Sequence, residues 1–116
     1  MTRIALALAV ALLAGSAQAR PPENADPALA PWFESLHTAN GGSCCSLADC
    51  RPVAYRTVGD HYEALIKPPE FEVDHPEWVP VPQNHILKRT QNPVGRAVAC
   101  WEPFSGILCF VLPAQV

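Results

Sequence analysis

The segment Val53–Ile66, which reads VAYRTVGDHYEALI, has the clearest local pattern in the chain and decides the fold class. Two runs rich in β-branched and aromatic residues flank Gly59-Asp60, and glycine in the first position of a two-residue loop favours a type II′ hairpin turn. This turn places Arg56 opposite Glu63 on one face of the hairpin. The other face then carries three pairs, which are Val53 with Ile66, Tyr55 with Ala64 and Thr57 with Tyr62. One register yields both an apolar face and an opposite-charge pair, which supports it.

A second hairpin is expected near the end of the chain, where the apolar residues 97–101 and 107–111 flank a loop that contains proline and glycine. If the loop is centred near residues 104–105, Cys100 falls directly opposite Cys109, and their side chains share a face.

Between the hairpins, Trp78–Pro82 is expected to be extended. Pro80 and Pro82 are two residues apart, so both lack an N–H group on the same side, as in an edge strand with its bare side outward. Residues 83–88 predict a short helical turn with its apolar residues buried, and residues 92–95 predict a turn.

The segment that precedes the strands, residues 27–42, predicts one short helix that ends at Asn40-Gly41-Gly42. Asp26 is a candidate N-cap and Pro27 suits the first helical position, although Pro31 could instead start a shorter helix. We interpret its apolar face as core packing rather than as a surface for ligand stacking; this face consists of Leu29, Trp32, Phe33 and Leu36.

These elements predict a mostly β domain, a small α+β fold, over residues 27–116. One N-terminal helix packs on two β-hairpins plus a short edge strand, and disulfides staple the parts together. An SH3-like barrel is one arrangement that fits these strands.

The first nineteen residues have the layout of a secretory signal peptide: a basic start, a short apolar run and Ala17-Gln18-Ala19 before Arg20. The alternative is a retained anchor, but the apolar run is about half the roughly 20 residues that a membrane-spanning helix needs. We expect cleavage after Ala19, a flexible arm over residues 20–26, and a periplasmic or secreted protein. The mature chain would carry 7 basic and 11 acidic residues, which argues against nucleic acid or a membrane surface as its partner.

The stretch SCCSLADC, residues 43–50, holds three of the five cysteines. Ser46 and Asp49 have the spacing of a capping box, which predicts that the cysteines lie on a loop leading into one helical turn. In an exported domain of this size, cysteines form disulfides far more often than they perform catalysis.

The five cysteines, Cys44, Cys45, Cys50, Cys100 and Cys109, cannot all pair within one chain. A bond between adjacent cysteines would demand unusual backbone geometry, and a bond across the second hairpin is an alternative. The more economical arrangement bonds each hairpin cysteine to the N-terminal cluster. Each such disulfide would close a long loop and stabilise the fold by about 2–4 kcal/mol. One of the two adjacent cysteines is then left free, or it joins two chains in a dimer.

No motif in the chain indicates catalysis, so we expect a non-enzyme without catalytic residues or a cofactor. The sequence lacks C-x-x-C, G-x-S-x-G and H-E-x-x-H. Copper or zinc binding by the cysteine cluster is the alternative, but no zinc-site spacing occurs, and the histidines are scattered over separate segments as His37, His61, His75 and His85. The alternating acidic residues Glu70, Glu72 and Asp74 could hold a hard cation, although a solvated acidic loop is the preferred interpretation.

The segments CCSLADCRPV, GDHYEALI, WVPVP, NPVGRAVACW and GILCFV resemble those of a family of short exported bacterial proteins of unknown function. The resemblance spans residues 32–112 and implies a single exported domain, with no functional residues to carry over. We therefore expect a non-catalytic binding or structural protein of the cell envelope, whose partner is another protein or an envelope component. The candidate contact groups are the acidic loop, residues 70–77, and Trp78.

Overall fold

The computed structural model describes residues 27–88 and 91–114. Its helical elements are η1 (Pro27–Leu29), α1 (Ala30–Glu34), α2 (Cys44–Leu47) and η2 (Gln83–His85). Its strands are β1 (Asp49–Val53), β2 (Tyr55–Val58), β3 (His61–Ile66), β4 (Glu77–Val81), β5 (Ala97–Glu102) and β6 (Gly106–Val111). The expected signal peptide, residues 1–19, and the expected arm, residues 20–26, lie outside the described residues.

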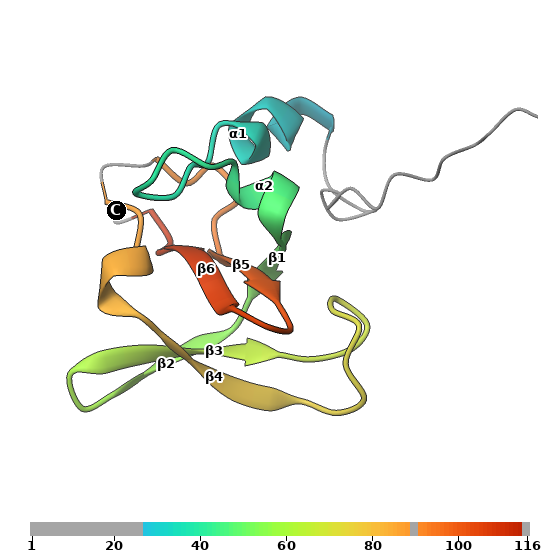
Figure 1. Ribbon diagram of the computed structural model, residues 1–116, viewed down its shortest axis with the longest axis vertical. Helices are drawn as coiled ribbons and strands as arrows, with labels where there is room; N and C mark the ends of the chain where they lie inside the picture. The colour runs from blue at the N-terminus through green and yellow to red at the C-terminus, as the bar shows by residue number, and fades with distance from the viewer. Residues whose placement is uncertain (1–26, 89–90, 115–116) are drawn as a thin grey trace, which may run out of the picture.

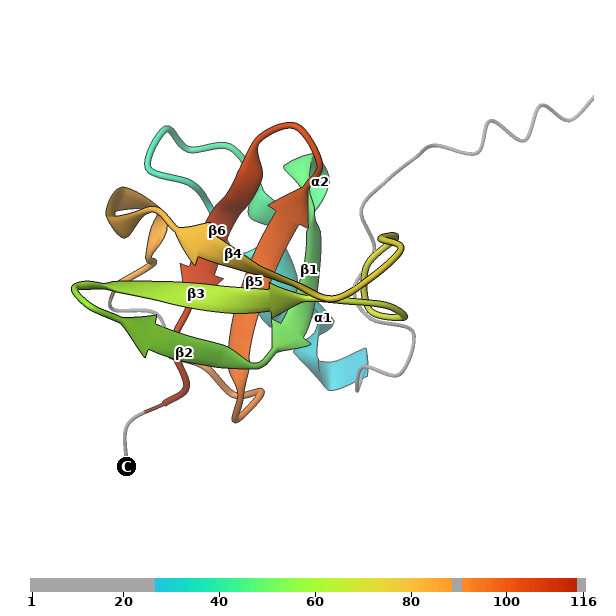
Figure 2. The same ribbon diagram turned by 90° about the horizontal axis from the view of Figure 1, so that it is seen from below.

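Two antiparallel three-stranded sheets, with strand orders β1-β5-β6 and β2-β3-β4, form the body of the domain. The β1-β5-β6 sheet is the central layer, with α1 and α2 on one side and the other sheet on the opposite side (Figure 1). From below, β3 and β4 cross β5 and β6 at a steep angle (Figure 2). The expectation of a mostly β domain with two hairpins and a short N-terminal helix is confirmed.

The central sheet is buried on both faces because its residues alternate between two cores. On β5, Val98 and Cys100 belong to the core under the helices, whereas Ala97 and Ala99 belong to the core between the sheets. The register shifts once, between Cys100 and Trp101, where the ladder with β6 contains a bulge. The predicted pairing of Cys100 with Cys109 is confirmed.

The first hairpin has the predicted register over β2 and β3. Arg56 lies opposite Glu63, and its Nη2 is 2.6 Å from Glu63 Oε1. Gly59 adopts φ +60°, the left-handed region that glycine reaches without strain, as the tight turn requires.

One predicted pair of this hairpin is wrong, because Val53 belongs to β1 and lies opposite Ala97 rather than Ile66. The extended chain passes from one sheet to the other at Ala54, between β1 and β2. Pairing with β5 buries Val53 to 5% exposure in the core between the sheets, and Ile66 lies in the same core. The apolar contact that the pattern predicted is therefore made across the two sheets.

The segment after η2, which continues from the second sheet, also contacts the central sheet at β6. Ile86 forms an isolated parallel bridge with Phe110, and the Leu87 N–H donates to the Phe110 carbonyl at 2.8 Å. Ile86 and Leu87, expected to be buried, are half-buried here, and the predicted turn is η2. Contact on both sides is what a small barrel requires, and the SH3-like arrangement stays a prediction.

The N-terminal helix is shorter than predicted. It ends at Glu34 with Ser35 as C-cap, well before Asn40-Gly41-Gly42, and a proline occupies its first positions, as in the alternative that starts at Pro31. Beyond Ser35 the backbone pairs with the segment before α2 instead of continuing the helix: the Leu36 carbonyl accepts from the Cys44 N–H at 2.9 Å, and His37 forms an isolated bridge with Ser43.

The predicted capping box is also wrong. Ser43, not Ser46, is the N-cap of α2, so Cys44 and Cys45 lie on the helical turn itself. Asp49 is the first residue of β1, opposite Trp101. Asp49 pairs with β5 in the strand ladder instead of capping the helical turn, because the ladder outweighs a single capping interaction.

Asn92 is buried at 4% exposure, the one polar side chain so buried in residues 27–88 and 91–114. Its Nδ2 donates to the carbonyls of Arg96 at 2.7 Å and Leu112 at 3.0 Å, and its Oδ1 accepts from the Val94 N–H at 2.9 Å. The side chain thus joins the turn before β5 to the segment after β6. No helix in the described part of the chain is long and apolar enough to cross a membrane.

Replacing Asn92 with alanine should lower the free energy of unfolding by about 3 kcal/mol, because each buried polar group left unpaired costs about 1–3 kcal/mol. Urea denaturation of the protein measures this. Asn84→Ala, at an exposed position, is the matched control and should change the free energy little. Equal effects of the two substitutions would contradict the role given to Asn92.

Candidate functional site

The five cysteines meet on the side of the central sheet that faces the helices. Two disulfides form, Cys44–Cys109 and Cys50–Cys100, with sequence separations of 65 and 50. Each hairpin cysteine is therefore bonded to the N-terminal cluster, as predicted, and the alternative bond across the hairpin is absent. Two such bonds are typical of an oxidising, extracytoplasmic compartment.

Cys45 is the free cysteine of the described chain. It is 8% exposed, and its Sγ donates to the Phe33 carbonyl at 3.3 Å. Burial raises the pKa of this thiol from 9.0 to about 11; the charges of Glu34 and Asp49 act in the same direction, and Arg51 opposes them. At neutral pH the thiol is thus protonated and a poor nucleophile, and its burial favours the free thiol over the alternative of a dimer joined through this cysteine.

The sulfur atoms form two overlapping groups. The Sγ atoms of Cys45, Cys50 and Cys100 lie within 4.8 Å of one another, as do those of Cys44, Cys100 and Cys109. No other set of three metal-ligating side chains comes this close in the part of the chain that the structure describes. While both disulfides are intact, however, the cluster offers a single thiol, so three thiolates become available only on reduction.

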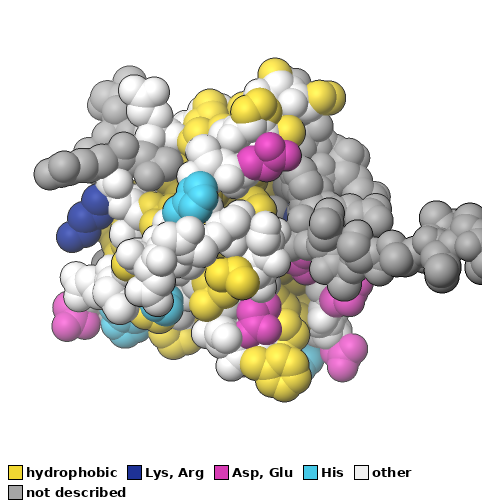
Figure 3. Space-filling model, turned by 45° about the horizontal axis from the view of Figure 1, so that its top comes forward, with side chains coloured by type: hydrophobic (Ala, Val, Ile, Leu, Met, Phe, Trp, Pro, Cys, Tyr) yellow, Lys and Arg dark blue, Asp and Glu magenta, His cyan; other side chains and the backbone are white. Residues whose placement is uncertain are grey.

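The contact groups suggested by the sequence lie elsewhere and do not converge. Glu70 pairs with Lys67 at 3.1 Å. Backbone hydrogen bonding, helped by this Lys67 contact, holds the pKa of Glu70 below its ordinary value. The Trp78 ring is covered by the Arg56 guanidinium, which lies 4.2 Å from the ring centroid. On the face in Figure 3, basic side chains are confined to one side of the described surface, so this face has no extended basic patch.

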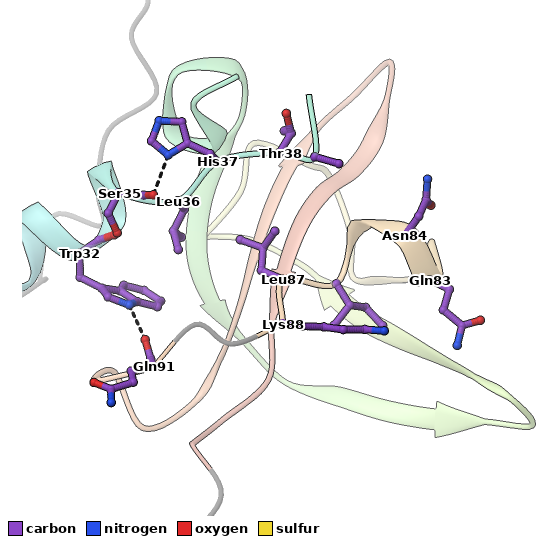
Figure 4. Close-up of a pocket in the computed structure, with 12 residues that line it drawn as sticks. Trp32, Ser35, Leu36, His37, Thr38, Gln83, Asn84, Leu87, Lys88 and Gln91 are labelled. Carbon is purple, nitrogen blue, oxygen red and sulfur yellow. Dashed lines mark hydrogen bonds between the residues drawn. The ribbon is translucent and has the colours of Figure 1, made fainter. Parts of the chain in front are cut away.

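The surface between α1 and the segment after η2 is hollowed, and sequence reasoning did not find it. Two adjoining hollows of about 790 Å³ and 900 Å³ share part of their lining. Trp32 contributes from α1, and Leu36 and His37 from the residues that follow it, while Leu87 and Lys88 face them from beyond η2 (Figure 4). The two sides of the hollow are far apart in the sequence, so no local pattern marks it.

Hydrogen bonds fix the wall on the α1 side of this hollow. The Trp32 indole N–H donates to the Gln91 carbonyl, which links α1 to the segment before β5. The His37 Nδ1–H donates to the Ser35 carbonyl at 2.7 Å. Trp32 also packs edge-on against Phe33, with ring centroids 5.1 Å apart. Trp32 therefore packs against the core, as predicted, but only in part: its indole is half-buried and also lines both hollows.

The described lining of the two hollows contains no carboxylate and no thiol. It combines one indole, one phenol, one imidazole, two hydroxyl groups, aliphatic side chains, four side-chain amides and one ammonium group, Lys88. Such a surface can stack and hydrogen-bond a ligand, and Lys88 favours one that carries negative charge. No family model, curated protein or solved structure matches the chain.

The raised pKa of Cys45 predicts a stability loss in alkali. Between pH 9 and about 11 the folded thiol keeps a proton that the unfolded thiol releases, so the free energy of unfolding falls over this range. The loss should reach about 2–3 kcal/mol, at roughly 1.4 kcal/mol per pKa unit.

Denaturant unfolding at several pH values, in the wild type and in Cys45→Ser, isolates this effect from other titrating groups. The serine keeps a donor for the Phe33 carbonyl but does not titrate in this range. Parallel pH profiles for the two proteins would contradict the assignment.

Proposed function

We propose that this chain is a small exported, disulfide-stabilised domain of the periplasm or the extracellular space that acts by binding and not by catalysis. Export is supported by the two disulfides and by the signal-like layout of residues 1–19. Binding is supported by the hollow beside Trp32, whose described lining holds stacking and hydrogen-bonding groups but no carboxylate or thiol.

The hollow fits a ligand with a flat apolar part and an anionic substituent. Trp32 offers a ring face, Leu36 and Leu87 offer aliphatic contacts, and Lys88 lies exposed where both hollows meet. Volumes of about 790 Å³ and 900 Å³ lie within the range of small-molecule sites, about 300–1,000 Å³. An envelope component or a partner protein's side chains could supply such groups.

The fluorescent probe 8-anilinonaphthalene-1-sulfonate has this chemistry, an aromatic body with one sulfonate, and can be titrated against the native mature chain. Lys88→Glu should weaken binding of the probe about tenfold or more, since a charge-assisted contact becomes a repulsion. Arg96→Glu reverses the same charge at an exposed position outside both linings and should change affinity by less than about twofold. Equal losses in the two variants would remove the hollow as the binding surface.

Metal binding by the reduced cysteine cluster is the second candidate. The observation that favours it is the meeting of two three-sulfur groups at Cys100, because soft thiolates select copper(I) and zinc. It requires that the protein is recovered with at least three free thiols, in contrast to the one free cysteine described above.

Intact mass after thiol alkylation, before and after reduction, together with elemental analysis of the same sample separates the two candidates. For protein unfolded without reductant, we expect one alkylated thiol and no stoichiometric metal, because four cysteines are bonded. Three or more alkylated thiols with bound copper or zinc would favour the metal function instead.

A further inference from the structure

The two sheets have four edges in the described chain, and three of them hinder the addition of another strand. β1 contains Pro52 and β4 contains Pro80, and proline has no N–H to offer an incoming strand. The outer side of β6 is partly occupied by Ile86 and Leu87. β2 contains no proline and is the outermost strand of its sheet (Figure 2), with no described segment paired on its outer side.

The hairpin register shows which backbone groups of β2 point outward. The Leu65 N–H donates to the Ala54 carbonyl at 2.9 Å, so Ala54 belongs to a hydrogen-bonded pair with β3. Because bonded and non-bonded pairs alternate along an antiparallel ladder, Arg56 and Val58 also bond to β3. The N–H and carbonyl groups of Tyr55 and Thr57 therefore point away from β3, toward the open edge.

The side chains of β2 leave this edge accessible. Its only charge is on Arg56, whose guanidinium donates to Glu63 Oε1 at 2.6 and 2.8 Å and stacks over Trp78, so it lies over the sheet and does not guard the edge. All four β2 residues are exposed, including the apolar Tyr55 at 38% and Val58 at 37%.

We propose that β2 is a docking edge at which two copies of this chain pair antiparallel about a two-fold axis, joining their β2-β3-β4 sheets into one six-stranded sheet. With Thr57 at the axis opposite its own copy, the outward backbone groups of both strands meet in register. Arg56 then lies opposite the partner's Val58, and Tyr55 opposite the partner's Gly59. The shift that would place Arg56 opposite its own copy is disfavoured by like charge.

This pairing is separate from the hollow beside Trp32 and does not use Cys45. A four-residue ladder buries little area, and interfaces below about 1,200 Å² are weak and transient. The association should therefore be reversible and visible only at high protein concentration. The ion pair with Glu63 weakens the repulsion between the two Arg56 guanidinium groups, and this register also keeps them from lying directly opposite each other.

Sedimentation equilibrium of the mature chain from about 10 μM to about 1 mM covers the range of such weak association. The mean mass of the wild type should rise from one chain toward two. Thr57→Pro removes an N–H that points outward and takes no bond from the ladder with β3, and it should raise the dissociation constant at least about tenfold. Thr57→Val keeps that N–H and the branched shape, and should associate like the wild type.

Hydrogen exchange on the wild type provides a measurement that does not depend on a variant folding. The amides of Tyr55 and Thr57 should exchange quickly in dilute protein and several-fold more slowly at high concentration, whereas amides bonded to β3 should not change. A wild type that stays monomeric throughout, or a dimer unaffected by Thr57→Pro, would overturn the proposal. Protection of Thr57 only on addition of a different protein would also overturn it, because the occupant would then not be a second copy.

Discussion

The domain depends on the placement of Cys100 and Cys109 side by side on β5 and β6, with both side chains directed toward the helices. Each sulfur bonds to a different N-terminal element, Cys109 to α2 and Cys100 to β1. α2 has four residues, and a helix of this length has no stability of its own in water. The Cys44–Cys109 bond, worth about 2–4 kcal/mol, holds α2 on the sheet where helix propensity could not. The Cys50–Cys100 bond joins the neighbouring strands β1 and β5 within the sheet.

The same central sheet supports the second sheet on its other face. Phe110 is fully buried there, with its ring centroid 5.9 Å from that of Tyr55 and 6.0 Å from that of Tyr62. Tyr55 can reach it because the chain turns at Ala54 from one sheet to the other. The hairpin of β5 and β6 thus contributes side chains to both cores, which is economical for a domain with little apolar surface to bury.

This layering separates the features that bear on function. The sulfur cluster lies inside, where burial raises the pKa of Cys45 and keeps its thiol unreactive. The hollows form where α1 and the residues after it meet those after η2, and the end of β6 lines one of them. The open edge of β2 belongs to the other sheet. A ligand in the hollow and a second chain at β2 could therefore be bound at the same time.

Much of the fold was predictable because its signals are local. The hairpin of β2 and β3 follows from its turn residues and alternation, and the pairing of Cys100 with Cys109 follows from the loop length. The bonds from both cysteines to the N-terminal cluster were predictable because they attach the N-terminal segment to the second hairpin. The errors concern ends and caps: α1 stops early where the backbone of Leu36 and His37 pairs with residues 43–44, and Asp49 leaves the expected cap to pair with β5.

The candidate binding surface could not be predicted in this way. Nothing near Trp32 in the sequence indicates that Leu87 and Lys88 face it, because that contact depends on the bridge between Ile86 and Phe110. The sequence by itself determined the strand pattern, the hairpin register and the cysteine positions, since each depends on neighbouring residues. The tertiary structure alone decided which cysteine stays free, where the chain changes sheets and where the surface is hollow, because each of these depends on contacts between segments far apart in the chain.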